Sequence, residues 1–115
     1  MVKVYGIPNC GSVKKAFTWL AENNIKFQFI DFKKEGISEL KLQQWLAQKP
    51  LEIVLNKNGT TWKGLTGVAQ KKATNQKEAI KLMTENTSLI KRPVIEYNTQ
   101  VIVGFNEEIY TTSLK

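Results

Sequence analysis

The first thirty residues contain a strand, a helix and a second strand in that order, and this order most constrains the fold. Val2 to Tyr5 is an apolar strand, and Ile25 to Ile30 alternates apolar and polar residues. Between them, residues 12–23 carry apolar side chains at helical spacing, namely Val13, Ala16, Phe17 and Leu20. A strand, a helix of this length and another strand form a βαβ unit, in which the strands are parallel and the crossover is right-handed. The chain is therefore predicted to be an α/β protein.

The middle of the chain, about residues 33–88, is predicted to be a helical insertion. A helix opens at Ser38, with Leu40, Trp45 and Leu46 as its apolar residues, and ends near Pro50. The other predicted segments are a charged turn at 31–36, a short helical or apolar segment at 51–55, a turn at 57–59, a capped helical turn at 61–65 and an amphipathic helix at 76–85.

The chain returns to the sheet near its C-terminal end. Residues 93–97 and 100–104 are predicted to form an antiparallel hairpin, and a final helix begins at Asn106 with acidic residues at its positive end. A length of 115 residues fits one domain. We therefore expect a mixed four-stranded sheet, βαβ followed by ββα, in a single domain of residues 1–115 with an inserted helical subdomain.

Composition excludes several classes of function. The chain has a formal charge of +7, but its lysines are scattered, which favours a solvated surface over a nucleic-acid-binding stripe. Histidine is absent and there is one cysteine, so a Cys-His hydrolase, a Ser-His-Asp triad and a zinc site are excluded. No internal disulfide can form, which points to the reducing cytoplasm. We expect neither an export signal nor a membrane span.

The single cysteine, Cys10, lies where the first strand turns into the first helix. Unpaired N–H groups and the macrodipole at a helix N-terminus stabilise a thiolate, and such locations lower a cysteine pKa. Lys14 and Lys15 make the neighbourhood electropositive. The alternative is a cysteine that serves as a small buried hydrophobe, but Cys10 precedes the apolar stripe of the helix.

Other motifs that could surround Cys10 do not fit. Gly6 and Gly11 have P-loop spacing but lack the Lys and Ser/Thr that follow in such loops. A phosphatase-type loop needs arginine where the chain has Ala16, and a dithiol redox centre needs cysteine where it has Val13. A disulfide at Cys10 must therefore be intermolecular and be resolved by a second molecule's thiol, for which glutathione is the abundant small candidate.

Five segments of the chain form a recognisable set of motifs: Tyr5–Cys10, Val13–Ala16, Asn58–Trp62, Leu89–Val94 and Val103–Glu107. Together they resemble the ArsC/Spx-type thioredoxin-fold family, and most closely its YffB-like subgroup. The resemblance implies a thioredoxin-like sheet with a helical insertion. It also implies a cis peptide bond at Pro93 beside the active thiol, where the backbone could pair with a peptide-like thiol such as glutathione.

Relatives of this type that reduce arsenate hold the oxyanion with three arginines while the cysteine attacks it, and glutathione with glutaredoxin completes the cycle. Arg92 matches one of these arginines, whereas Leu55-Asn56-Lys57 and Val103-Gly104-Phe105 supply no other. Lysine supplies charge but not a planar fork. The alternative for Arg92 is a plain surface cation. Arsenate reduction is accordingly the less favoured function.

The leading hypothesis is a cytoplasmic, monomeric, glutathione-dependent monothiol oxidoreductase acting on a small oxidised or anionic substrate. Its predicted catalytic residues are Cys10, Lys14 and Arg92. Its predicted substrate or glutathione site comprises Asn9, Gly11, Ser12, Arg92, Pro93 and Thr61. Glutathione is the expected cosubstrate, glutaredoxin is a candidate partner, and no metal or tightly bound cofactor is expected. The alternatives are an Spx-type regulator that binds RNA polymerase, and arsenate reductase proper.

Overall fold

Four strands form one mixed sheet, in the order β2-β1-β3-β4, in a computed structural model that describes all of residues 1–115. β1 (Val2–Gly6) pairs in parallel with β2 (Phe27–Asp31) and antiparallel with β3 (Val94–Tyr97), and β3 pairs antiparallel with β4 (Gln100–Val103). The parallel βαβ unit and the antiparallel hairpin predicted from the sequence are confirmed. The α/β, thioredoxin-like fold class is confirmed with them.

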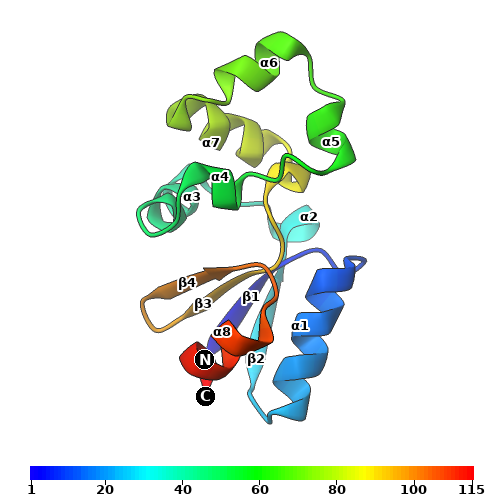
Figure 1. Cartoon of the computed structure of the whole chain (residues 1–115), viewed down its shortest axis with the longest axis vertical. Coiled ribbons are helices and arrows are strands. Elements are labelled where there is room, and N and C mark those ends of the chain that lie inside the picture. Colours follow the sequence, from blue (N-terminus) through cyan, green and yellow to red (C-terminus); the bar gives the residue numbers. More distant parts are fainter. The chain divides into compact units, whose positions relative to one another are not determined.

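Two helices pack on one face of this sheet, α1 (Gly11–Glu22) and α8 (Glu107–Leu114) (Figure 1). Val4, Ile95 and Ile102 stand in one row across β1, β3 and β4, and they belong to the same buried cluster as apolar residues of both helices. The helical members of that cluster are Ala16, Trp19, Leu20, Tyr110 and Leu114. Burial of this apolar face is the main force that holds the two helices to the sheet.

The close approach of β1 to α1 depends on a glycine. A Cβ atom added to Gly6 would lie 2.8 Å from Cγ2 of Val13, which is fully buried. Real Cβ atoms do not come this near another carbon. Glycine at this position therefore lets the strand end directly beside the helix that follows, and the short loop between them carries Cys10 to the start of α1.

Contacts along the chain divide it into two compact units, one of residues 1–35 and 92–115 and the other of residues 36–91. The first contains the sheet, α1, α8 and the one-turn helix α2 (Phe32–Glu35). The helical elements of the second are α3 (Glu39–Leu46), α4 (Leu51–Val54), α5 (Thr60–Lys63), α6 (Gly67–Lys72), α7 (Gln76–Glu85) and the 3-10 turn η1 (Thr87–Leu89). The expectation of a single domain with an insertion stays a prediction.

Helix α7 has the bounds that its apolar spacing predicts, and Ala79, Ile80 and Met83 are buried. Other predictions in this region were wrong in detail. Leu40 is 64% exposed, and Leu42 takes the buried position in α3. α6 was not predicted, because six residues with no buried side chain give no periodic signal.

Two further segments differ from the sequence prediction. The charged turn at 31–36 is largely the helix α2, in which Phe32 is 1% exposed and the Asp31 carboxylate accepts a hydrogen bond from the Lys33 N–H at 2.9 Å. β2 begins at Phe27 rather than Ile25. No helix of the structure combines the length and the hydrophobicity that a membrane span requires.

Candidate active site around Cys10

Cys10 is the N-cap residue of α1, with extended backbone angles (φ −117°, ψ 127°). Its carbonyl oxygen accepts the first hydrogen bond of the helix, from the Lys14 N–H at 3.0 Å. The thiol is partly exposed and forms no disulfide. The expected location of the thiol, at a helix N-terminus and within reach of solvent, is what the structure shows. The alternative of a fully buried cysteine is not supported.

Burial and local positive charge act in opposite directions on this thiol. Burial has the largest single effect and raises the pKa of Cys10, because removal from water disfavours the charged thiolate. The backbone N–H of Val13, the side chain of Arg92 and the backbone N–H of Ser12 lower it. Although the thiol makes no capping hydrogen bond of standard geometry, these groups together outweigh burial. The pKa of Cys10 therefore lies below the ordinary value of a thiol.

Arg92 and Pro93 belong to this site although they lie about eighty residues after Cys10 in the sequence. The Arg92–Pro93 peptide bond is cis, as the resemblance implied. Pro93 is buried and Arg92 is half-buried, and Pro93 directly precedes β3. The Pro93 carbonyl accepts a hydrogen bond from the Gly104 N–H at 2.7 Å, which ties this segment to the end of β4. The structure thus brings Cys10 and Arg92 together although the sequence separates them widely.

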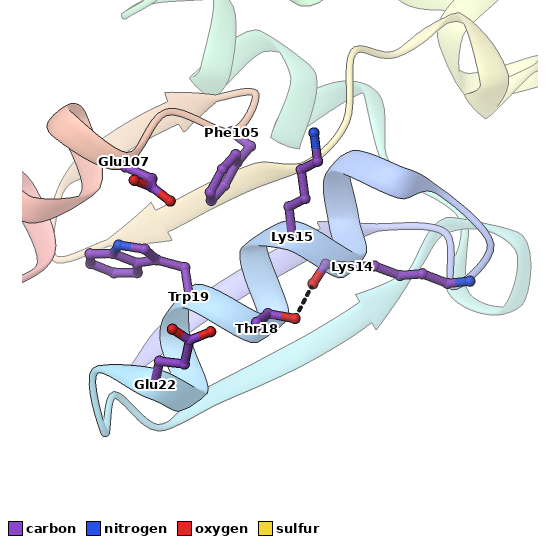
Figure 2. A pocket seen from close by; sticks show the side chains of 7 residues that line it. All are labelled: Lys14, Lys15, Thr18, Trp19, Glu22, Phe105 and Glu107. Carbon is purple, nitrogen blue, oxygen red and sulfur yellow. Dashed lines mark hydrogen bonds between the residues drawn. The ribbon is translucent and has the colours of Figure 1, made fainter.

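Lys14 has a different setting. Its side chain is exposed, and it lines a groove of about 460 Å³ along α1. Figure 2 shows Lys14 and Lys15 leaving α1 in different directions, with the Trp19 ring between the carboxylates of Glu22 and Glu107. Lys14 is not among the groups that shift the pKa of Cys10. Its predicted catalytic role stays a prediction.

The remaining predicted residues fall into two places. Asn9, Gly11 and Ser12 are exposed beside Cys10 at the start of α1. Thr61 lies in α5, within the unit of residues 36–91. The capped turn predicted at 61–65 is the helix Thr60–Lys63, and the prediction of a side-chain cap was wrong, since the N-cap is Gly59. No group of three or more His, Cys, Asp or Glu side chains is placed to hold a metal ion.

The sequence predicts that N–H groups of the first helical turn act on the thiol, without identifying them. The structure identifies them as those of Ser12 and Val13, although the sequence pattern assigns residue 13 only to the apolar stripe. A hydrogen bond at the end of β4 was also not predicted: Tyr110, which is fully buried, donates to the Gly104 carbonyl at 2.7 Å. Only the folded structure shows the partner of this hydroxyl.

Comparisons with known proteins agree with this architecture. The solved structure of a YffB protein superimposes with a TM-score of 0.96, at 36% identity over 100% of both chains. An arsenate reductase (ArsC) related protein from Brucella melitensis has a TM-score of 0.76 and 37% identity over 99% of this chain and 94% of its own. Global transcriptional regulator Spx 2 from Lactococcus lactis subsp. lactis is 31% identical over 94% of this chain and 82% of its own.

The family model described as ArsC matches residues 5–113, which include both Cys10 and the Arg92–Pro93 segment. A match of this extent covers nearly the whole of the chain, and the relatives with 30% identity or more span it in the same way. The chain therefore belongs to the ArsC family.

Proposed function

We propose that the protein is a monothiol oxidoreductase that uses the Cys10 thiolate as a nucleophile on a small oxidised or anionic substrate, with glutathione as the reductant. The observation that carries this proposal is the environment of Cys10. The thiol is partly exposed, and Arg92 and two backbone N–H groups lower its pKa despite partial burial. A thiolate in reach of solvent is the reactive form of cysteine.

The proposed reaction with a disulfide substrate has three exchange steps. In the first, the Cys10 thiolate attacks one sulfur of the substrate, a mixed disulfide forms and the other substrate sulfur leaves as a thiolate. In the second, a glutathione thiolate attacks the Cys10 sulfur of the mixed disulfide, which forms a Cys10–glutathione disulfide and releases the remaining substrate sulfur as a thiolate. In the third, another glutathione thiolate attacks the glutathione sulfur of that disulfide, forms oxidised glutathione and releases the Cys10 thiolate. Two glutathione molecules are thus oxidised for each substrate disulfide reduced. The external thiol is required because Cys10 is the only cysteine.

Arg92 has two proposed roles in this scheme. It stabilises the Cys10 thiolate, and its planar guanidinium can bind a carboxylate or another oxyanion of the substrate. Pro93, Asn9, Gly11 and Ser12 are proposed to form the remainder of the ligand site near the thiol. Lys14 and Thr61 are proposed as a secondary cation and a secondary ligand contact, and the support for these two rests on the sequence.

Two measurements test the proposal. The rate of Cys10 alkylation against pH gives the thiol pKa, and we expect a value clearly below the ordinary value of about 8.5. Titration with glutathione, followed by amide NMR, should shift the signals of Gly11, Arg92 and Val94. A thiol pKa near 8.5 contradicts an activated thiolate, and shifts confined to residues elsewhere remove glutathione from the mechanism.

A second candidate is the binding of RNA polymerase by an Spx-type regulator. It is favoured by the 31% identity to a protein named as a global transcriptional regulator. Capture from a bacterial lysate distinguishes the two functions. Stoichiometric recovery of RNA polymerase, unchanged in a Cys10→Ala variant, would favour the regulator.

Arsenate reduction, suggested by the name of the Brucella relative, is tested directly by arsenate turnover with glutathione and glutaredoxin.

A further inference from the structure

We propose that Tyr110 is a positioning residue for the site: its hydroxyl acts through Gly104 and Pro93 to hold Arg92 in place beside Cys10. The inference rests on the proposed function, because it assigns Arg92 an active role. It concerns a residue of α8 that contacts neither the thiol nor a ligand. Three observations lead from the hydroxyl to Pro93, the residue that follows Arg92 in the chain.

The first observation is the pair of hydrogen bonds that join Tyr110 to Pro93. The Tyr110 hydroxyl donates to the Gly104 carbonyl at 2.7 Å, and the Gly104 N–H donates to the Pro93 carbonyl at 2.7 Å. The first has the usual length of an O–H···O bond, and the second is at the short end of the N–H···O range. Burial raises the pKa of Tyr110, so its hydroxyl stays protonated and remains a donor throughout the physiological range.

The second observation is that the Pro93 end of the hairpin has fewer backbone hydrogen bonds than an ordinary ladder position. Val94 pairs with Val103, so Pro93 and Gly104 are the next pair of the antiparallel ladder. Proline has no N–H to donate, so this pair is joined by one ladder hydrogen bond instead of two. Gly104 also has a positive φ of 88°, where the chain leaves the sheet. The hydrogen bond from the Tyr110 hydroxyl to Gly104 should therefore stabilise this position more than it would a position inside the ladder.

The third observation is that the Tyr110 ring is fixed by packing that does not require its hydroxyl. The ring makes edge contacts with Trp19, at 5.4 Å between centroids, and with Phe105, at 5.3 Å. The side chain is fully buried. Phenylalanine would fill the same space without burying a polar group. Packing of the ring against Trp19 and Phe105 therefore fixes the direction of the hydroxyl toward Gly104. This is the arrangement expected of a residue that positions its partner.

The test compares two tyrosine variants, Tyr110→Phe and Tyr5→Phe. Tyr5 is the matched control, since it is also buried and its hydroxyl donates a hydrogen bond of 2.7 Å, but to Glu96. The readout is the pKa of Cys10 from alkylation rates against pH. We expect Tyr110→Phe to raise this pKa by about 0.3–0.5 units, which is about a two- to threefold change in the ionisation constant, and Tyr5→Phe to leave it unchanged.

A double variant shows whether Tyr110 acts through Arg92. In an Arg92→Gln background, Tyr110→Phe should produce no further change in the thiol pKa, because the group that it positions is absent. An equal shift in the two backgrounds would overturn the inference, and so would equal shifts in the Tyr110 and Tyr5 variants or no shift in either.

Two results separate this inference from the proposed function. If the wild-type pKa is about 8.5, the activated thiolate itself fails. If the wild-type pKa is low and Tyr110→Phe does not move it, only the positioning role fails. Should the Tyr110 variant not fold, hydrogen exchange of the Gly104 amide in the wild-type protein tests one part of the anchor, its bond to the Pro93 carbonyl. The anchor requires this amide to be strongly protected, and rapid exchange would contradict it.

Discussion

The reactivity of Cys10 depends on a balance between burial, which raises its pKa, and three nearby groups that lower it. Two of those groups are backbone N–H groups at the start of α1, which any residue at the N-cap of this helix would meet. The third is the Arg92 side chain, which is the one contribution that substitution can remove without changing the helix. At the scale of single residues, Arg92 is therefore the main adjustable element of the site.

Removal of the Arg92 charge should raise the thiol pKa. We expect Arg92→Gln to have the largest effect and Arg92→Lys a smaller one, because lysine keeps the charge but loses the planar guanidinium. Lys14→Gln removes an exposed charge that is not among the groups acting on the thiol, and it should change the pKa much less. Alkylation rates against pH measure all three variants. A shift in Lys14→Gln as large as that in Arg92→Gln would reverse the assigned roles.

The lowered pKa also predicts a pH dependence of stability. The folded thiol ionises at a lower pH than the unfolded thiol, whose pKa is about 8.5. Wild type should therefore gain stability relative to Cys10→Ser as pH rises from the folded pKa to the unfolded pKa of about 8.5. Above that pH the gain stays constant, and it is lost as pH falls through the folded pKa. Urea unfolding of both proteins at several pH values measures the difference. A difference that does not vary with pH would contradict a lowered pKa.

At the scale of secondary structure, the contact between β1 and α1 determines where Cys10 lies. Gly6→Ala would place a methyl group 2.8 Å from Cγ2 of Val13, so we expect it to destabilise the fold by about 1–3 kcal/mol. Val13→Ala leaves a cavity and should cost a similar amount on its own. In the double variant the new methyl group occupies part of that cavity. The stability lost in the double variant, measured by urea unfolding, should be clearly smaller than the sum of the losses in the two single variants. Strict additivity would show that the two sites do not touch.

The same elements show what could be predicted from the sequence. The predictions of α1 and α7 were correct because apolar residues recur at helical spacing over ten or more residues. The prediction of the hairpin was correct because two apolar strands flank a turn. Short elements such as α2 and α6 have four and six residues, too few for a period to be seen. In α3, Leu40 and Leu42 are both apolar, and packing alone decides that Leu42 is the buried one.

The site was predictable only in part, for a related reason. A thiol at the start of a helix follows from local sequence, because strand, loop and helix are consecutive. The meeting of Cys10 with Arg92 does not, since it depends on the antiparallel pairing of β1 with β3. That contact was expected from the family resemblance and not from spacing. The link from Tyr110 to Pro93 depends on two hydrogen bonds that form only in the folded state, so no sequence pattern predicts it.

At the scale of the whole molecule, the chain has two compact units, and the first is assembled from both ends of the chain. The second, residues 36–91, is a continuous segment of a size at which a single apolar core gives only marginal stability. Its fully buried side chains include Leu42 in α3, which contacts α7. Ile95 in β3 has the same burial in the first unit. These two residues allow the units to be perturbed separately.

Leu42→Ala and Ile95→Ala should each cost about 2–5 kcal/mol, because each removes a fully buried side chain. If the units open independently, Leu42→Ala should speed hydrogen exchange mainly in α7, and Ile95→Ala mainly in β1, β3 and β4. The thiol pKa of Cys10 should also stay near its wild-type value in Leu42→Ala, since all the groups that shift it lie in the first unit. Equal acceleration in every element of both variants would instead show that the 115 residues unfold as one cooperative domain.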